Sequence, residues 1–176
     1  MKAVVAIDQE WGIGCQGGLL VHVRADLKHF YQLTVGKAVI LGSKTLQTFP
    51  GGKVLKNRTN LILSRNPDYA PEGGLVFSSV DALLAFLKEH PEHEAVVIGG
   101  GTVYEQLLPY CDEVYVTRFE RIYEKDTYFP NLDKDPAWIC ADMGEELQSD
   151  PETDSEKDLT YRFLLYKRVS TDLTKK

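Results

Sequence analysis

The chain has 176 residues, of which 43% are hydrophobic and 26% are charged, so it can bury a sizeable core as one globular domain. It contains no apolar run of about 18 residues and no basic stretch followed by an apolar leader, which predicts a cytoplasmic protein that neither spans a membrane nor is secreted. Its formal net charge of −6 argues against nucleic acid or an anionic membrane surface as a partner.

Apolar runs typical of buried strands alternate with patterns typical of helices along most of the chain. This alternation predicts an α/β fold, a single domain in which helices flank a central, mostly parallel twisted sheet. Strands are expected at 2–7, 37–41, 60–64, 94–98 and 112–119, and helices around Asp26, at 78–90 with Ser79 as N-cap, and at 102–108. Residues 138–144 and 159–169 are expected to form an antiparallel hairpin, joined by a solvated acidic connection at 145–158.

Asp26 lies in the first turn of an expected helix, on the side where that helix is apolar. At about 100° per residue, the side chains that share this arc are Leu27, Phe30, Tyr31, Leu33 and Thr34. A carboxylate in such an arc loses hydration unless a partner completes its hydrogen bonds, so Asp26 is a candidate functional acid. A favourable interaction with the helix dipole is the structural alternative.

A basic segment interrupts this acidic chain between Lys37 and Pro67, where six basic residues occur and no acid. A solvated surface is the commoner explanation of an isolated charge run, and a site for a small anionic ligand is the other. Two expected strand ends in this segment carry side chains suited to phosphate groups, namely Gly42, Ser43, Lys44 and Thr45 at one end and Ser64 and Arg65 at the other.

Gly99, Gly100 and Gly101 join an apolar strand to the start of a helix. Glycines at such a place let a phosphate approach the backbone beside the free N–H groups of the helix start, although a tight turn is equally compatible with them. The run is not the dinucleotide-binding fingerprint, because Tyr104 stands where that pattern has glycine.

Cysteine and histidine positions argue against a metal site. The three cysteines, Cys15, Cys111 and Cys140, are widely spaced and form no CxxC pair, which favours reduced thiols over disulfides or zinc ligands. The four histidines do not stand at ligand spacing from them, and we therefore expect no metal.

The order of these motifs resembles that of the dihydrofolate reductase family. The matching segments follow the family order and are together highly specific: "GIG" at 12–14, "ADLKHF" at 25–30, "ILGSKT" at 40–45, "NRTNLILSR" at 57–65, "VIGGGTVYEQLLP" at 97–109, "VYVT" at 114–117 and "DTYFP" at 126–130. The last quarter of the chain agrees only in its final strands.

This resemblance implies an enzyme that reduces 7,8-dihydrofolate to 5,6,7,8-tetrahydrofolate by hydride transfer from NADPH to the pterin ring. It also implies a monomer that binds folate analogues, with one domain at 1–176 and a lobe for the cofactor adenosine at about 38–90. Two alternatives stay open. One is a related NADPH-dependent aminopyrimidine reductase of riboflavin synthesis, against which Asp26 and Arg58 speak, and the other is a low-activity pteridine-binding module.

The resemblance also implies roles for individual residues. Asp26 resembles the single acid of the pteridine pocket, supported by Thr117, while Leu19 belongs to a loop that closes over the nicotinamide. The other residues implied at the substrate are Val4, Val5, Ala6, Leu27, Phe30, Phe49, Leu55, Arg58, Ile98 and Tyr104. Those implied at the cofactor are Ala6, Ile13, Gly14, Gly17, Gly18, Leu19, Gly42, Ser43, Lys44, Thr45, Leu63, Ser64, Arg65, Ile98, Gly99, Gly100, Gly101, Thr102, Val103, Tyr104 and Gln106, with a cis peptide bond between Gly99 and Gly100.

Three residues depart from the family pattern. Val21 stands where many members have Trp, Arg24 where many have Pro, and Ser43 where Arg is common. Val21 offers no N–H donor to fix a water near the pterin, so we expect altered selectivity at that site. With serine at position 43, Lys44 and Arg65 are expected to carry more of the phosphate recognition.

Overall fold

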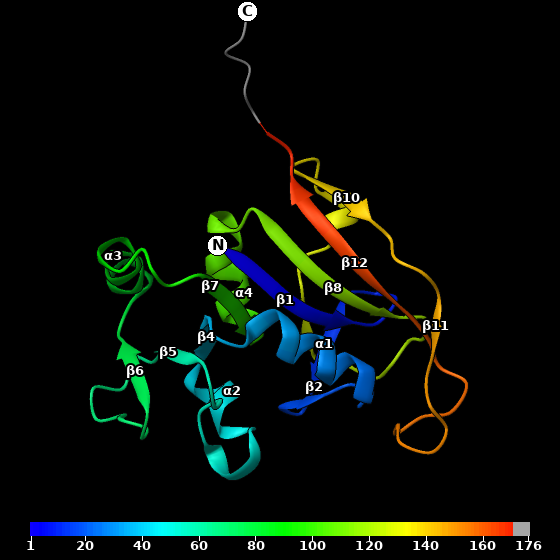
Figure 1. Cartoon of the computed structure of the whole chain (residues 1–176), viewed down its shortest axis with the longest axis horizontal. Helices are drawn as coiled ribbons and strands as arrows, with labels where there is room; N and C mark the ends of the chain where they lie inside the picture. Colours follow the sequence, from blue (N-terminus) through cyan, green and yellow to red (C-terminus); the bar gives the residue numbers. More distant parts are fainter. Residues whose placement is uncertain (171–176) are drawn as a thin grey trace, which may run out of the picture.

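The computed structural model, which describes residues 1–170, is built on one twisted nine-stranded sheet (Figure 1). Its strands lie in the order β10-β12-β8-β1-β7-β4-β5-β6, with β11 paired to β12. The pairs from β8 to β6 are parallel, whereas β12 is antiparallel to β8, β10 and β11. The strands are β1 (Lys2–Ile7), β4 (Ala38–Gly42), β5 (Thr59–Leu63), β6 (Gly74–Phe77), β7 (Ala95–Gly99), β8 (Glu113–Phe119), β10 (Trp138–Asp142), β11 (Leu147–Gln148) and β12 (Thr160–Arg168). The expected α/β class, mostly parallel sheet and antiparallel C-terminal pair are confirmed.

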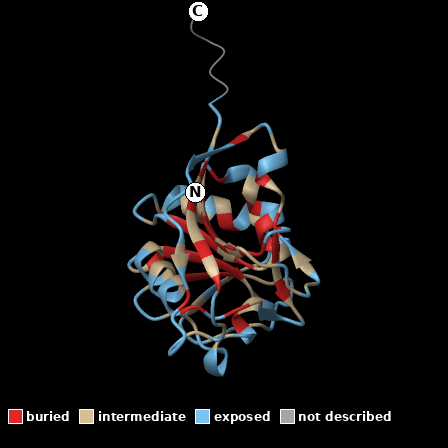
Figure 2. Ribbon diagram, turned by 90° about the vertical axis from the view of Figure 1, so that its right-hand side faces the viewer, coloured by how far each residue is buried: buried red, intermediate tan, exposed pale blue. Residues whose placement is uncertain are grey.

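Helices cover both faces of this sheet. They are α1 (Arg24–Thr34), α2 (Ser43–Gln47), α3 (Val80–Glu89) and α4 (Gly101–Leu107), with short 3₁₀ turns at Pro50–Gly52, Leu108–Tyr110 and Leu132–Lys134. The largest apolar cluster joins Ala3, Val5 and Ile7 of β1 to α3 and α4, and two smaller clusters lie on the other face. Figure 2 shows that burial concentrates along the strands. Of the helices within residues 1–170, none has the length and apolar character needed to cross a bilayer.

The start of α3 follows the expected capping rule. Ser79 Oγ accepts a hydrogen bond from Ala82 N at 3.1 Å, as predicted for an N-cap serine. At α1 the N-cap residue is Val23, whose apolar side chain cannot do this, and Asp154 Oδ1 accepts the N–H of Arg24 at 2.8 Å instead.

The sequence suggested that the acidic segment 145–158 is a simple solvated connection. The structure shows that this expectation is wrong. Its β11 pairs with β12, and Ser155 exchanges backbone and side-chain hydrogen bonds with His22 just before α1. The expectation failed because these contacts join separate segments, in the case of Ser155 and His22 133 positions apart, which local polarity does not reveal.

The apolar side of α1 is more open than its pattern suggests. The helix buries Thr34, but Leu27 is 50% exposed and Tyr31 is 45% exposed. Apolar side chains left exposed side by side on a helix are typical of a surface that receives a ligand.

A second, three-stranded sheet was not predicted from the sequence. It consists of β3 (Gly18–Leu19), β2 (Gly12–Cys15) and β9 (Thr127–Tyr128), in that order. Asp126 joins its strands, since Asp126 N donates to Gly14 O at 3.0 Å and its Oδ2 accepts Gln16 N at 2.9 Å. Strands of two to four residues are too short to show an alternating pattern.

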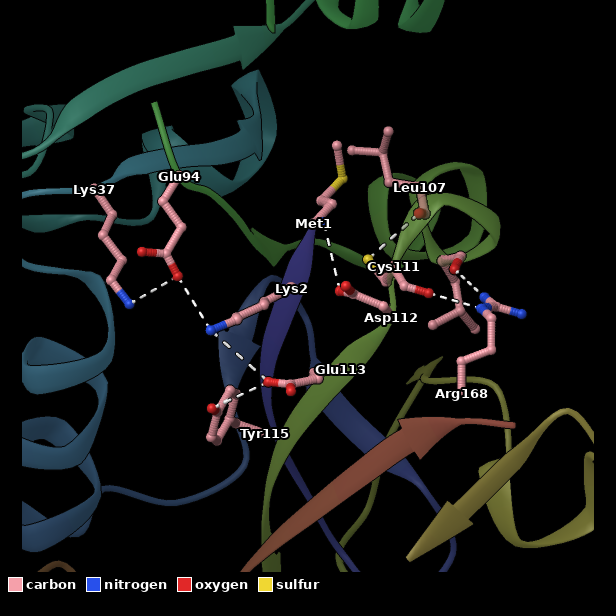
Figure 3. Close-up of polar contacts among 11 residues, drawn as sticks. Met1, Lys2, Lys37, Glu94, Leu107, Cys111, Asp112, Glu113, Tyr115 and Arg168 are labelled. Atoms are coloured by element: carbon pink, nitrogen blue, oxygen red, sulfur yellow. Dashed lines mark hydrogen bonds and ion pairs between the residues drawn. The ribbon is translucent and has the colours of Figure 1, made fainter. Parts of the chain in front are cut away.

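Polar contacts close the edge of the main sheet where its parallel strands begin (Figure 3). Lys2 Nζ lies 3.1 Å from Glu94 Oε1, which also pairs with Lys37 at 3.3 Å. On the other side, Arg168 donates to Cys111 O at 2.8 Å and to Leu108 O at 2.7 Å, so it satisfies carbonyls that follow α4. These contacts fix β12 to the chain segment that precedes β8.

A buried ion pair joins the small sheet to the main one. Lys125 Nζ lies 2.7 Å from Asp8 Oδ2 and 2.5 Å from Glu10 Oε2, and the Lys125 and Asp8 side chains are 4% and 0% exposed. Burial acts to raise the pKa of Asp8, but hydrogen bonds from Lys125 and from backbone amides outweigh it and hold this pKa below its usual value. Both partners are therefore charged at neutral pH.

We predict that Lys125→Met destabilises the fold strongly, because it leaves the Asp8 charge buried and unpaired. The midpoint of thermal unfolding should fall by about 10 °C. The matched control is Lys2→Met, which breaks an exposed pair and should shift the midpoint by less than about 2 °C. The double variant Asp8→Asn/Lys125→Met should recover part of the loss, and equal midpoints for Lys125→Met and wild type would contradict the assignment.

Candidate functional site

Asp26 meets Thr117 across the space between α1 and the sheet. Thr117 Oγ1 donates a hydrogen bond to Asp26 Oδ1 at 2.6 Å, the pairing that the family resemblance implies. Burial raises the pKa of Asp26 above its usual value, and the Thr117 hydrogen bond offsets only part of this rise. A carboxyl group that keeps its proton toward higher pH can serve in proton transfer near neutrality.

Strand register determines which residues face Asp26. Ala6 of β1 pairs with Thr117 of β8, and Thr117 pairs with Phe163 of β12, so the three form a row across the sheet. Paired residues on neighbouring strands point to one face, here the face covered by α1. On the opposite side of β1, the Tyr104 hydroxyl donates to Val4 O at 2.6 Å.

A small pocket opens beside the carboxyl group. It is lined by Ala6, Ile13, Leu19, Leu20, Val21, Asp26 and Phe119. The structure thus brings together four of the predicted site residues, and it places Val21 on the same side as Asp26, as the sequence comparison suggested. Leu20 and Phe119 were not predicted. Phe119 lies two residues after Thr117 on the same strand face, a signal that period-two counting could have found.

Arg58 lies beyond the exposed side of α1. Its Nη1 donates to Thr34 Oγ1 at 3.1 Å and its Nε to Lys56 O at 2.8 Å, and the guanidinium lies 5.4 Å from the centroid of the Tyr31 ring. Arg58 is half-buried next to apolar side chains, and these contacts leave N–H donors of its guanidinium free. Phe49, Leu55 and Ile98 contact the cluster formed by Val39, Leu41, Leu46 and Ile62.

The two candidate phosphate segments meet at one edge of the sheet. Gly42 at the end of β4 pairs with Leu63 at the end of β5, and Leu41 pairs with Gly99 of β7. Carboxyl ends of parallel strands are the usual ligand-binding edge of such sheets. The hydroxyl and basic residues of two strand ends and the glycine run therefore converge in space, as a ligand with several phosphates requires.

The backbone of the glycine run is shaped for close approach. Gly99 has φ +128°, which side chains rarely adopt, and the Gly99–Gly100 peptide bond is cis, as expected. A Cβ atom on Gly100 would lie 2.9 Å from Thr45 Oγ1, so a side chain there would fill the space between β7 and α2. This narrow, side-chain-free cradle beside Lys44 and Thr45 fits a pyrophosphate group.

The remaining predicted cofactor residues differ in burial. Arg65, Thr102 and Gln106 are exposed, as is Lys44, whereas Ser64 is half-buried and its Oγ accepts Asn66 N at 3.2 Å. The side chain of Val103, and that of the predicted substrate residue Val5, lie in the core cluster on the α4 face, where only their backbone remains available to a ligand. Gly14, Gly17 and Gly18 belong to the hairpin of β2 and β3. No group of three or more His, Cys, Asp or Glu side chains within residues 1–170 is arranged to hold a metal ion.

Fold and site together define a class of protein, an α/β protein built on one large, mostly parallel sheet, with one carboxyl group in an apolar pocket and with glycine and basic residues at the carboxyl ends of its parallel strands. The family model for dihydrofolate reductase matches residues 1–168. The dihydrofolate reductase of Bacillus subtilis (strain 168) is 33% identical over 170 residues, which cover 96% of this chain and 94% of that protein. The type 3 dihydrofolate reductase of Salmonella typhimurium is 41% identical over 110 residues, 62% of this chain and 65% of that protein.

A solved structure agrees with these relatives. Dihydrofolate reductase from Enterococcus faecalis, complexed with NADP(H) and RAB-propyl, superposes with a TM-score of 0.82 and 34% identity, and the match covers 96% of both chains. The chain therefore belongs to the dihydrofolate reductase family.

We predict that Asp26→Asn stabilises the fold while it impairs the site. Because the folded-state pKa of Asp26 is raised, its contribution to stability is fully present below the unfolded pKa near 3.8 and is lost as the pH rises through the folded value. The asparagine amide keeps an oxygen that accepts the Thr117 hydrogen bond. Because the amide does not ionise, the variant avoids the loss of stability that Asp26 causes at higher pH. The free energy of unfolding in urea at pH 7.5 should rise by about 1 kcal/mol, and the gain should shrink toward pH 4.

Asp68→Asn is the matched control for that measurement, since Asp68 is exposed, and it should change stability by less than about 0.5 kcal/mol. A destabilised Asp26→Asn protein at pH 7.5 would show that the carboxylate is well solvated or paired in the fold.

Proposed function

We propose that Asp26 and Thr117 carry the chemistry by which this member of the family reduces 7,8-dihydrofolate to tetrahydrofolate. The observation that carries the proposal is the 2.6 Å hydrogen bond between them inside an apolar pocket, with the pKa of Asp26 raised by burial. When bound, NADPH supplies the hydride. The protein's own part is to hold the pterin, to exclude water and to promote protonation of the ring.

Asp26 suits that part because its carboxyl group has a second oxygen free to accept hydrogen bonds from the pterin ring and its amino group. Thr117 fixes the first oxygen, so the second has a defined direction. The apolar lining of Ala6, Leu20 and Phe119 excludes water from the same space. In a desolvated site, a proton shared with the pterin is held more strongly than in water.

The exposed side of α1 is proposed to receive the rest of the substrate. Leu27, Phe30, Phe49 and Leu55 would contact the benzoyl ring of dihydrofolate or of folate analogues. Arg58 would pair with a glutamate carboxylate; its contacts with Thr34 and Lys56 support this role because they hold its direction without neutralising its charge.

The strand ends of β4, β5 and β7 are proposed to hold NADPH. Lys44, Thr45 and the backbone of Gly99 to Thr102 suit its pyrophosphate, and Ser64 with Arg65 suits the 2′-phosphate that distinguishes it from NADH. Residues at about 38–90 would then form the adenosine-binding lobe. Leu19, the last residue of β3 and 58% exposed, would cover the nicotinamide.

We also propose that the enzyme acts in the cytoplasm as a monomer; the free thiols of Cys15, Cys111 and Cys140 suit a reducing compartment. An aminopyrimidine reductase or a pteridine-binding module remains the competing interpretation of the site alone. An assay of NADPH oxidation separates the dihydrofolate reductase, the aminopyrimidine reductase and the binding module. It is run with dihydrofolate, with an aminopyrimidine substrate and with neither.

We predict that Asp26→Asn slows hydride transfer about a hundredfold at pH 7.5 and much less at pH 5, where solution protons replace the missing acid. Single-turnover oxidation of bound NADPH by dihydrofolate measures this rate. NADPH affinity, followed by fluorescence, should stay near the wild-type value. A rate equal to that of the wild type across this pH range would remove Asp26 from the chemistry.

We predict that Arg65→Ala weakens NADPH binding about 10- to 100-fold and leaves NADH binding nearly unchanged, because only NADPH has a phosphate for the guanidinium to pair with. Lys53→Ala, in the same basic segment, is the control and should leave both affinities unchanged. Equal losses for both dinucleotides would place Arg65 away from the 2′-phosphate.

A further inference from the structure

Asp26 and three further side chains, His29, Phe163 and Thr117, come together from α1, β12 and β8. His29 follows Asp26 by three residues, so both occupy one face of α1. His29 stacks on Phe163 of β12, with ring centroids 4.0 Å apart and an interplanar angle of 27°. Phe163 pairs with Thr117 across the strands, and Thr117 donates to Asp26.

The stack is anchored to the core. Because Phe163 and Thr117 are directly opposed in an antiparallel pair, both side chains point toward α1. Phe163 also meets Tyr161 edge to face, with centroids 5.6 Å apart, and packs on the cluster that contains Val23 and Phe119. The His29 ring is therefore held beside the turn of α1 that carries Asp26.

We propose that His29 is a positioning residue for the reaction, whose ring, held by Phe163, excludes water from the inner side of the Asp26 carboxyl group. This role rests on the function proposed above for Asp26. It explains how the chain keeps water away from the Asp26 carboxyl group on the side that does not face the pocket. The Ala6 and Phe119 side chains cover the pocket side, and the stacked pair covers the side toward β12.

A neutral imidazole suits this place. Burial lowers the pKa of His29, which favours the uncharged ring near neutral pH. A cation here would instead favour the carboxylate form of Asp26. Two ionisable groups interact with the charge of Asp26, Tyr104 on α4 and Tyr161 on β12; burial and nearby acids raise their pKa values, so both stay uncharged. Charged Arg24 and Lys28 on α1 are exposed.

The test is the pH profile of hydride transfer in the enzyme loaded with NADPH. In His29→Ala, water reaches Asp26, its pKa falls, and the descending limb of the profile should move to lower pH by about half a unit or more. The rate at pH 7.5 should then fall about threefold. His29→Phe keeps the stack and should leave the limb in place. His29→Gln, which fills space without a ring, should move it as His29→Ala does.

Two variants calibrate the result. His93→Ala removes a histidine stacked on Phe86 at 6.0 Å, near the amino ends of the parallel strands, and should leave the profile unchanged. Thr117→Val removes the hydrogen bond that lowers the pKa of Asp26 and should move the limb in the opposite direction, to higher pH.

An unmoved limb in folded His29→Ala or His29→Gln protein overturns the inference. So does an equal displacement in His29→Phe, which would assign the effect to the polarity of the imidazole. If Asp26→Asn itself leaves hydride transfer unchanged, the proposed function fails and the role of His29 fails with it. If Asp26→Asn slows the reaction while the His29 variants do not move the limb, only the role of His29 is wrong.

Discussion

The site depends on the hydrogen-bonded register that joins β1, β8 and β12. It places Ala6, Thr117 and Phe163 in one row under α1. A slip of one residue between two of these strands would turn every second side chain to the opposite face. Thr117 would then point into the core with its hydroxyl unpaired, and Asp26 would lose its donor. Arg168, bonded to the carbonyls of Leu108 and Cys111, helps to hold β12 in that register.

Burial of one acid is the physical cost of the candidate site. The fold holds Asp26 in an apolar space, where its charged form is disfavoured and one hydrogen bond from Thr117 compensates only in part. Proteins keep such unfavourable arrangements at functional sites when the surrounding structure determines them strongly. Here the surrounding structure is the sheet register on one side and α1 on the other.

The sequence was sufficient where the pattern is local. Runs such as 38–42 and 95–99 are apolar throughout because those strands are buried on both faces, and Ser79 showed the start of α3 through ordinary capping chemistry. The pairing of Asp26 with Thr117 came from the family resemblance, because no spacing rule connects residues 91 positions apart.

Contacts between distant segments could not be predicted in this way. The docking of Asp154 and Ser155 at the start of α1 and the ion pair of Lys125 with Asp8 involve residues that are individually ordinary surface types. Exposure of Leu27 and Tyr31 was missed because helical periodicity shows which side of a helix is apolar, and not whether that side meets the core or a ligand.

The position of the Lys125 side chain limits which substitutions the chain can accept at position 12. Its aliphatic stem lies directly against Gly12, and a Cβ atom at position 12 would overlap it. Since the ammonium group is bound by Asp8, Glu10 and the carbonyl of Tyr123, the stem cannot move far without disturbing these contacts. A larger residue at position 12 is therefore compatible only with a smaller one at position 125. Natural variants of this chain should exchange the two residues together, and an alignment of its near relatives would reveal them as a covarying pair.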